Sequence, residues 1–327
     1  MRLCKDRMIK DVVDGEILQV AVNSRINMIA FFSSDDFVEL RTYPDFKPVK
    51  RIVRYVEPLD RSFYTEEVLI AELGDSSSWS NYSYLPLSIQ TKISPTKIAF
   101  HPMGTQFVVG YANGDMVVYE LPSFNIVIEK NLKDPIIALQ FMSNQILFVG
   151  TSAGNFGWYN TLNWRFKMTL KDKFMNPRLA ICARKTKMMF VIDHKRHLKA
   201  YSTDTKNLMY DIKAHNREIM DIQTNEFFST VVTSSLDGKI KMFDMLSGEL
   251  KTTLLGHKDE VHSINVFDDE RFMVSTSEDN SVKLWDLTRG RTLRTFFGLS
   301  NSFCTARHQN LIVMGDIEGA IKTWKIT

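Results

Sequence analysis

Histidine, serine and aspartate residues occur along this chain in sets that could serve as a hydrolase triad or as metal ligands. His257, Ser275 and Asp279 have the residue types of a nucleophile, its base and an orienting acid. Residues 193–197 contain an Asp and two His, but a turn and a strand do not bring ligands together as one helical face does. No phosphate-binding loop, zinc-protease motif or nucleophile elbow occurs. We therefore expect no catalysis, no metal and no cofactor, provided that the first set has a structural explanation.

That explanation comes from a repeated unit. The clearest copy runs from Gly256-His257 to Trp285-Asp286, and the preceding copy places His215 the same 28 residues before Phe243. Each copy reads as a strand, a tight turn and an alternating strand. The residues at the Trp position are Arg41, Tyr119, Tyr159, Tyr201, Phe243, Trp285 and Trp324. From Tyr119 onward their spacing is 40, 42, 42, 42 and 39 residues, the period of four-stranded propeller blades.

These residues resemble the WD-repeat (WD40) β-propeller family, and the resemblance covers nearly the whole chain. It implies an all-β fold in which residues 1–327 form one propeller domain. The gap from Arg41 to Tyr119 is 78 residues, nearly two periods, so we favour eight blades, with Tyr84 at the missing Trp position, over seven with an insertion near 55–90. The expected blades are 13–52, 53–92, 93–132, 133–173, 174–214, 215–256, 257–298 and 299–327. Residues 1–12 are expected to add the closing strand to the last blade, which removes two exposed sheet edges.

The resemblance also implies a buried hydrogen-bonded tetrad in two of the blades. A buried Asp needs donors around it, and a His and a hydroxyl supply them. One tetrad is His257, Ser275, Asp279 and Trp285. The other is His215, Thr233, Asp237 and Phe243, which lacks the indole N–H. The triad-like residues are thus interpreted as a structural relay inside a blade.

Family members generally bind partners on the face where the loops before the first strand and after the second strand open. The family's contact positions lie three and five residues after the tetrad His and one before the tetrad Asp. They correspond here to Glu218, Met220, Leu236, Glu260, His262 and Glu278, with Ser302, Cys304 and Ile317 in the last blade. Three carboxylates could accept a Lys or Arg side chain, and Met220 and Leu236 could pack against its stem. A solvated polar rim is the alternative.

Composition narrows the remaining classes. Net charge is +3, from 41 basic and 38 acidic residues, which is too balanced to demand a nucleic-acid partner. Two basic groups, at 184–187 and 194–199, fall on opposite faces of one blade. No apolar run approaches the roughly 20 residues that span a bilayer. Cys4, Cys182 and Cys304 fit neither a disulfide framework nor a zinc site, so we expect a reducing compartment, cytoplasmic or nuclear.

The expected function is therefore that of a non-catalytic scaffold or adaptor that holds a protein, possibly a basic or extended peptide, at the mouth of the propeller. Most blades lack a full tetrad, so we expect a monomeric ring supported by partners in a larger hetero-complex. The alternative is an RNA- or ribonucleoprotein-binding propeller that uses the basic residues at 184–199. A substrate receptor of a ubiquitin ligase is a further alternative, although Arg289 follows Trp285-Asp286 one place too late for that motif.

Overall fold

The computed structural model describes residues 3–9, 12–13, 15–23, 25–54, 92–171, 177–183, 185–267, 271–297, 302–308 and 311–326. These residues form 28 strands arranged in seven four-stranded antiparallel sheets. Among them no helix has the length and apolar character needed to cross a bilayer.

Each sheet is one blade, and its strands run outward from the centre in chain order, except that β1 is the outermost strand of the last blade. The first three blades are β2 (Ile17–Asn23), β3 (Met28–Ser33), β4 (Phe37–Thr42), β5 (Pro48–Val53); β6 (Pro95–Phe100), β7 (Gln106–Tyr111), β8 (Asp115–Glu120), β9 (Ile126–Asn131); and β10 (Ile136–Ser143), β11 (Ile146–Thr151), β12 (Asn155–Asn160), β13 (Phe166–Lys171). The next three are β14 (Pro177–Cys182), β15 (Met188–Asp193), β16 (His197–Ser202), β17 (Leu208–Lys213); β18 (Ile219–Asn225), β19 (Thr230–Ser235), β20 (Ile240–Asp244), β21 (Leu250–Leu254); and β22 (Val261–Val266), β23 (Phe272–Ser277), β24 (Ser281–Asp286), β25 (Arg291–Phe297). The last is β26 (Ser302–His308), β27 (Leu311–Asp316), β28 (Ile321–Ile326) and β1 (Leu3–Ile9).

Burial follows the position of a strand within its blade. Second strands such as β3, β15 and β19 are buried at every residue, because both faces of the sheet pack against neighbouring blades. Outer strands such as β9 and β17 alternate between exposed and half-buried residues. The turns between second and third strands each contain one residue with positive φ, which fixes the tight reversal. These residues are Asp36, Gly114, Gly154, Arg196, Gly238, Asn280 and Gly319.

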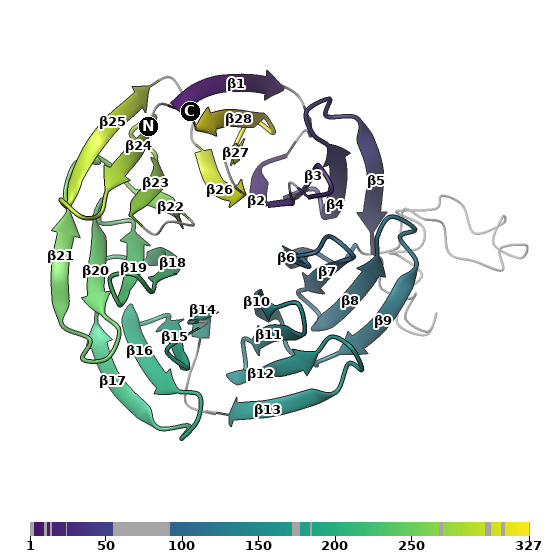
Figure 1. Ribbon diagram of the computed structural model, residues 1–327, viewed down its shortest axis with the longest axis horizontal. Coiled ribbons are helices and arrows are strands. Elements are labelled where there is room, and N and C mark those ends of the chain that lie inside the picture. The colour runs from purple at the N-terminus through teal and green to yellow at the C-terminus, as the bar shows by residue number, and fades with distance from the viewer. Residues whose placement is uncertain are drawn as a thin grey trace, which may run out of the picture.

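The blades form a closed ring of seven, so the prediction of eight is wrong and the seven-blade alternative is right (Figure 1). Consecutive inner strands contact each other all the way round, and β2 contacts both β6 and β26. Residues 55–91, most of the predicted extra blade, lie outside the described residues. Spacing alone misled the count, because a gap of nearly two periods can equally hold one blade and a long connection.

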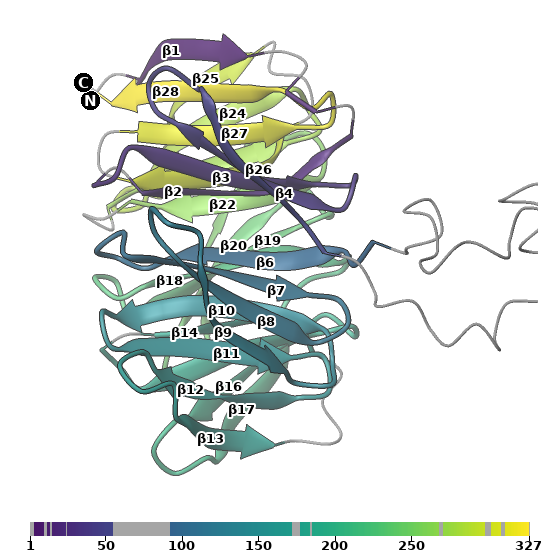
Figure 2. The same ribbon diagram turned by 90° about the vertical axis from the view of Figure 1, so that its right-hand side faces the viewer.

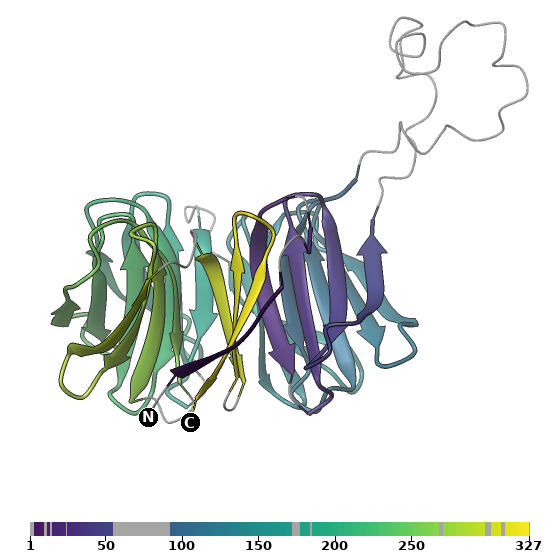
Figure 3. The same cartoon turned by 90° about the horizontal axis from the view of Figure 1, so that it is seen from above.

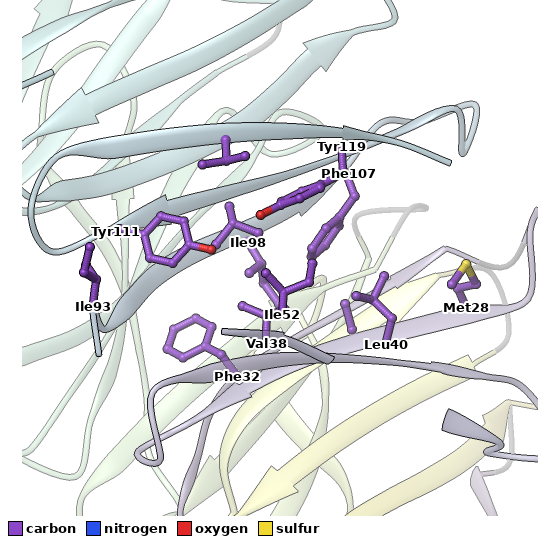
Figure 4. Packing of buried hydrophobic residues seen from close by; sticks show 13 residues of the cluster. Met28, Phe32, Val38, Leu40, Ile52, Ile93, Ile98, Phe107, Tyr111 and Tyr119 are labelled. Carbon is purple, nitrogen blue, oxygen red and sulfur yellow. The ribbon is translucent and has the colours of Figure 1, made fainter. Parts of the chain in front are cut away.

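A shared apolar core between the first two blades explains why they meet directly. Met28, Phe32 and Val38 of the first blade pack with Phe107 and Tyr111 of the second in one buried cluster (Figure 4). All five are at most 8% exposed. A further blade would have to separate these side chains and expose both surfaces to a new neighbour.

The ring closes through the N-terminal strand, as the sequence analysis expects. Strand β1 pairs antiparallel with β28, with Leu3 opposite Ile326 and Ile9 opposite Ile321. The two ends of the described chain therefore lie side by side in the last blade (Figures 1 and 2). Seen edge-on, the strands run between two faces of a disc (Figure 3). We call the face that carries the connections from each outer strand to the next inner strand the mouth face.

Candidate functional site

The blade β22–β25 contains a complete hydrogen-bonded relay. The Trp285 Nε1–H donates to Ser275 Oγ at 2.7 Å, and Ser275 Oγ lies 2.7 Å from His257 Nε2. His257 Nδ1 lies 2.9 Å from Asp279 Oδ2. A neutral imidazole satisfies all three contacts if Nδ1 carries the proton and Nε2 accepts from the serine. The four side chains link the loop before the blade, its second strand, its turn and its third strand.

Electrostatics keep this relay in one protonation state. Burial lowers the pKa of His257 more than the neighbouring Asp279 raises it, so the imidazole is held neutral. Burial alone would raise the pKa of Asp279, but hydrogen bonds from Ser281, the Lys258 N–H and His257 outweigh it and lower the pKa to about 2. Ser275 is fully buried. Its hydroxyl cannot meet a substrate, so the set acts as a structural cross-link.

The preceding blade, β18–β21, holds a three-membered version. His215 Nε2 lies 2.8 Å from Thr233 Oγ1, and His215 Nδ1 lies 3.0 Å from Asp237 Oδ2. Phe243 occupies the Trp position, buried at 4% exposure, and offers no donor. Burial lowers the pKa of His215 as well, so this histidine is also held neutral.

The predicted contact residues of these two blades lie on the mouth face. Backbone hydrogen bonds join the loops that carry them: the Leu236 N–H donates to Glu218 O, and the Glu278 N–H donates to Glu260 O. Glu260, His262 and Glu278 come together, with ligand atoms all within 4.8 Å of one another. We call the six residues Glu218, Met220, Leu236, Glu260, His262 and Glu278 the mouth cluster.

Each carboxylate of the mouth cluster already has a cationic or hydrogen-bonding partner within the chain. Glu218 pairs with Arg178 of the preceding blade, and Glu260 pairs with Arg217 at 2.5 Å. Glu278 Oε1 lies 3.1 Å from His262 Nε2. The cluster is therefore a set of ion pairs and hydrogen bonds, and not the bare acidic surface that the sequence suggested. Arg178 stands at the repeat position that Met220 and His262 occupy in the following blades, whereas Arg217 stands at no contact position of the family.

The comparison with known families decides what this ring is. One family model, described as WD domain, G-beta repeat (WD40), matches residues 206–244 and 248–286. Those two matches end on the third strands of the two blades that hold the relays, and the other five sheets repeat the same arrangement around the ring. The chain is a WD-repeat β-propeller. No curated protein matches it closely enough to serve as a relative.

In the last blade of the propeller, two predicted contact residues were placed one position too late. Ser302 lies opposite Asp316, as Val261 lies opposite Ser277, so Ser302 corresponds to Val261 and not to Glu260. Cys304 is buried at 7% exposure, and burial raises the pKa of its thiol to about 12. It faces the interior of the ring and not a partner.

The propeller's metal-like sequence at 193–197 is engaged otherwise. Asp193 Oδ1 accepts hydrogen bonds from the backbone N–H groups of Lys195 and His197, so this carboxylate stabilises the turn between β15 and β16. His197 Nδ1 lies 2.6 Å from Asp211, and these ligand atoms do not converge with others in the part of the chain that the structure describes. The mouth cluster does bring metal-type ligands together, but Arg217 already neutralises Glu260, and the absence of a metal stays a prediction.

Below the mouth cluster, the central channel has a cavity of about 460 Å³. Burial raises the pKa of Asp221 to about 6, although the Ile264 N–H at 3.0 Å and Ser263 Oγ at 3.2 Å donate to this carboxylate. Burial also lowers the pKa of Lys97, which faces the same cavity. Asp221 reaches from β18 to the backbone of β22, so it ties two blades together, and sequence reasoning did not single it out.

Proposed function

We propose that this propeller is a non-catalytic scaffold that holds a protein or peptide partner at the mouth cluster within a multi-subunit assembly. WD-repeat propellers are in general protein-interaction scaffolds, and the mouth is where the chain places its convergent charged groups. The observation that carries the proposal is the meeting of Glu260, His262 and Glu278 within 4.8 Å at the rim of the channel.

The mechanism is an exchange of ion-pair partners. Arg217, which pairs with Glu260, is 57% exposed, and Glu218 is 59% exposed. The other member of each pair is more buried, with Glu260 at 18% and Arg178 at 29% exposure, so only one side chain of each pair is readily reached by solvent. An incoming cation would approach from that exposed side and exchange for the intrachain arginine. A guanidinium from the partner gains two parallel hydrogen bonds to a carboxylate. Half-buried Met220 and Leu236 lie beside Glu218 and pack against the aliphatic stem.

Three expectations about the protein's setting belong to the same proposal. We expect the scaffold to have no catalytic activity, and the set of Ser275, His257 and Asp279 is an internal cross-link. The ring acts as a monomer among different subunits. Its compartment is reducing, in the cytoplasm or nucleus, in keeping with Cys182 and Cys304, which are both free and buried.

The test is affinity purification with mass spectrometry of the full chain. The test variant is Glu218→Lys/Glu260→Lys/Glu278→Lys. The matched control is Asp45→Lys/Glu120→Lys/Glu249→Lys, which changes the net charge equally at three exposed residues in or next to turns on the opposite face. Both variants are first shown to melt as the wild type does.

The proposal expects one set of proteins to disappear with the mouth variant and to remain with the control variant. Equal partner lists for wild type and mouth variant would show that partners bind elsewhere on the ring. Loss of the same proteins from both variants would mean that overall charge, and not the mouth cluster, governs the association.

A further inference from the structure

The even charge balance of the chain hides a strongly basic segment. Residues 135–192 contain eight Lys or Arg and one acidic residue, Asp172, whereas the whole chain has 41 basic and 38 acidic residues. Its described part forms the blade β10–β13 and the first half of the next blade. Of these eight cations, Arg178 pairs with Glu218 and Lys187 with Asp204, and Lys173 and Arg184 lie outside the described residues. Arg165 and Lys167 are the two that matter for the groove described next.

A groove of about 390 Å³ lies between these two blades. One wall is formed by Trp158 on β12, Lys167 on β13 and Arg165, which immediately precedes β13. The other wall includes Ala183 and Lys187. The groove opens at the C-terminal ends of β12 and β14. On this face of the ring, the first strand of each blade connects to the second, and the third connects to the fourth. The groove is therefore on the face opposite the mouth cluster, and its occupation does not depend on the proposed function.

The register of the sheet places an aromatic ring and a cation together in this groove. Trp158 lies directly opposite Lys167 in the β12–β13 pair, so both side chains project from the same side of the blade. The Trp158 ring packs on Phe148, with a centroid separation of 6.0 Å, and is half buried while still lining the groove. Packing on one side holds the indole in place as a fixed wall.

The basic side chains at the rim of the groove are accessible to a ligand. Arg165 and Lys167 are exposed, and their side chains form no hydrogen bond or ion pair with any other residue that the structure describes. Lys187 pairs with Asp204 at 2.9 Å, but these side chains are 69% and 61% exposed. Such an exposed pair is weak and exchanges readily for another anion.

We propose that this groove binds single-stranded nucleic acid, with a base stacked on Trp158 and the backbone phosphates at Arg165, Lys167 and Lys187. Aromatic platforms flanked by basic side chains are how proteins hold unpaired strands. A duplex keeps its bases stacked inside and cannot offer one to an indole within a groove. A lipid headgroup would satisfy the cations but leave the ring without a partner.

The RNA-binding alternative from the sequence placed the contacts at 184–199, where several side chains are engaged within the chain. Lys199 lies between Asp193, at 3.4 Å, and Asp211, at 3.7 Å, and His197 is bonded to Asp211. Arg184 lies outside the described residues. The groove uses Lys187 from that stretch together with Trp158, Arg165 and Lys167. Trp158 and Lys187 lie 29 residues apart in the sequence.

The experiment is fluorescence anisotropy of the full chain with a labelled oligouridylate of about 12 nucleotides, measured over a range of salt. Parallel probes are an oligothymidylate and a duplex RNA of the same length, and phosphatidylcholine vesicles with and without phosphatidylinositol 4-phosphate. We expect a single strand to bind more tightly than the duplex or the vesicles. The two single-stranded probes distinguish RNA from DNA as the natural source.

The variants test the two parts of the site separately. Arg165→Glu/Lys167→Glu should weaken single-strand binding at least ~10-fold and reduce the magnitude of the salt slope by about 1.4, roughly 0.7 for each lost phosphate contact. Lys213→Glu/Lys258→Glu, the same change at exposed residues away from the groove, should leave affinity unchanged. Trp158→Leu should weaken binding by roughly 10-fold, the value of one stacked base, and Trp158→Phe should retain most of it.

No binding of either single strand would overturn the proposal, as would equal weakening by the control pair or binding to vesicles alone. Trp158 packs on Phe148, so Trp158→Leu is interpreted only if its melting curve matches the wild type. If it unfolds, Arg165→Glu/Lys167→Glu decides, because both of those side chains are exposed.

Discussion

Lys322 and Asp316 form a fully buried ion pair in the last blade. Lys322 Nζ lies 2.7 Å from Asp316 Oδ2, and the side chains are 1% and 0% exposed. Asp316 Oδ1 also accepts the N–H groups of Glu318 and Ala320. Lys322→Met keeps the stem and removes the ammonium, which leaves a buried carboxylate without its counter-ion. The expected loss is about 3–5 kcal/mol in the free energy of unfolding.

The assay compares buried and exposed versions of the same pair. Lys187→Met removes an ammonium that lies 2.9 Å from Asp204 in a pair that is 69% and 61% exposed, and it should cost about 0–1 kcal/mol. For a chain of this length each kcal/mol lowers the melting temperature by roughly 1.5 °C. Lys322→Met should therefore melt about 4–8 °C below the wild type. Urea denaturation followed by tryptophan fluorescence gives the same comparison at constant temperature.

A double variant separates loss of the pair from an unpaired charge. Asp316→Asn/Lys322→Met removes both charges, and it should be more stable than Lys322→Met alone. If Lys322→Met and Lys187→Met have equal effects, burial does not set the strength of these pairs and the reasoning fails. It fails equally if the double variant is the least stable of the three.

The remaining predictions concern the relays and the closure. Trp285 donates its N–H to Ser275, whereas the buried Trp324 Nε1 has no hydrogen-bond partner among the residues that the structure describes. Trp285→Phe should thus cost about 1 kcal/mol more than Trp324→Phe in urea denaturation, and equal midpoints would contradict this. Burial lowers the pKa values of His215 and His257, so the unfolded chain takes up protons first as pH falls. Stability should be full above pH about 6.5 and decline below it, in melting curves from pH 8 to 5, and this decline should be smaller in His215→Gln/His257→Gln. Deleting residues 1–12 removes the strand paired with β28 and should lower the melting temperature sharply; an unchanged curve would refute the role of that closure.

The repeat in the sequence located the third strand of every blade that the structure describes. Trp285 lies opposite Met273, Tyr159 opposite Leu147 and Arg41 opposite Ile29, always at the same place in the register. The period carries this information because each blade needs one inward-packing residue there, even where the Trp has become Tyr or Arg. The number of blades was not fixed by the same signal, since it depends on how β2 packs against β6.

The candidate site was only half predictable for a similar reason. Family positions place Glu218 and Glu260 on the mouth face, but the arginines that pair with these two carboxylates come from different elements. Arg178, the partner of Glu218, lies 40 residues earlier on the preceding blade, and Arg217, the partner of Glu260, comes from the loop before β18. Contacts between blades follow from how the sheets pack, and no spacing within one repeat encodes them. The groove at Trp158 is likewise formed by two blades and marked by neither alone.

A recurring lysine in the sequence indicates contacts that the other repeat positions do not predict. A lysine stands two residues before the Trp position in four consecutive blades, and each one has a different acceptor. Lys199 Nζ reaches Asp193 at 3.4 Å, Lys241 Nζ donates to Ala214 O at 2.7 Å, Lys283 Nζ donates to Thr295 Oγ1 at 3.0 Å, and Lys322 Nζ reaches Asp316 at 2.7 Å. A charged residue recurring at an inward-facing place indicates a paired, blade-specific contact.

Polar contacts of this kind also stabilise blades that lack a tetrad. The first blade has Arg at the Trp position, and there Arg41 and Arg51 both bind Glu39, which is buried at 2% exposure. The second blade has Asp115 held by Arg54, an ion pair that joins it to the first blade. These two blades without a tetrad are thus cross-linked by other polar groups. Degraded tetrads are therefore no reason by themselves to require a permanent partner for stability, and the assembly proposed for this ring must rest on its surfaces.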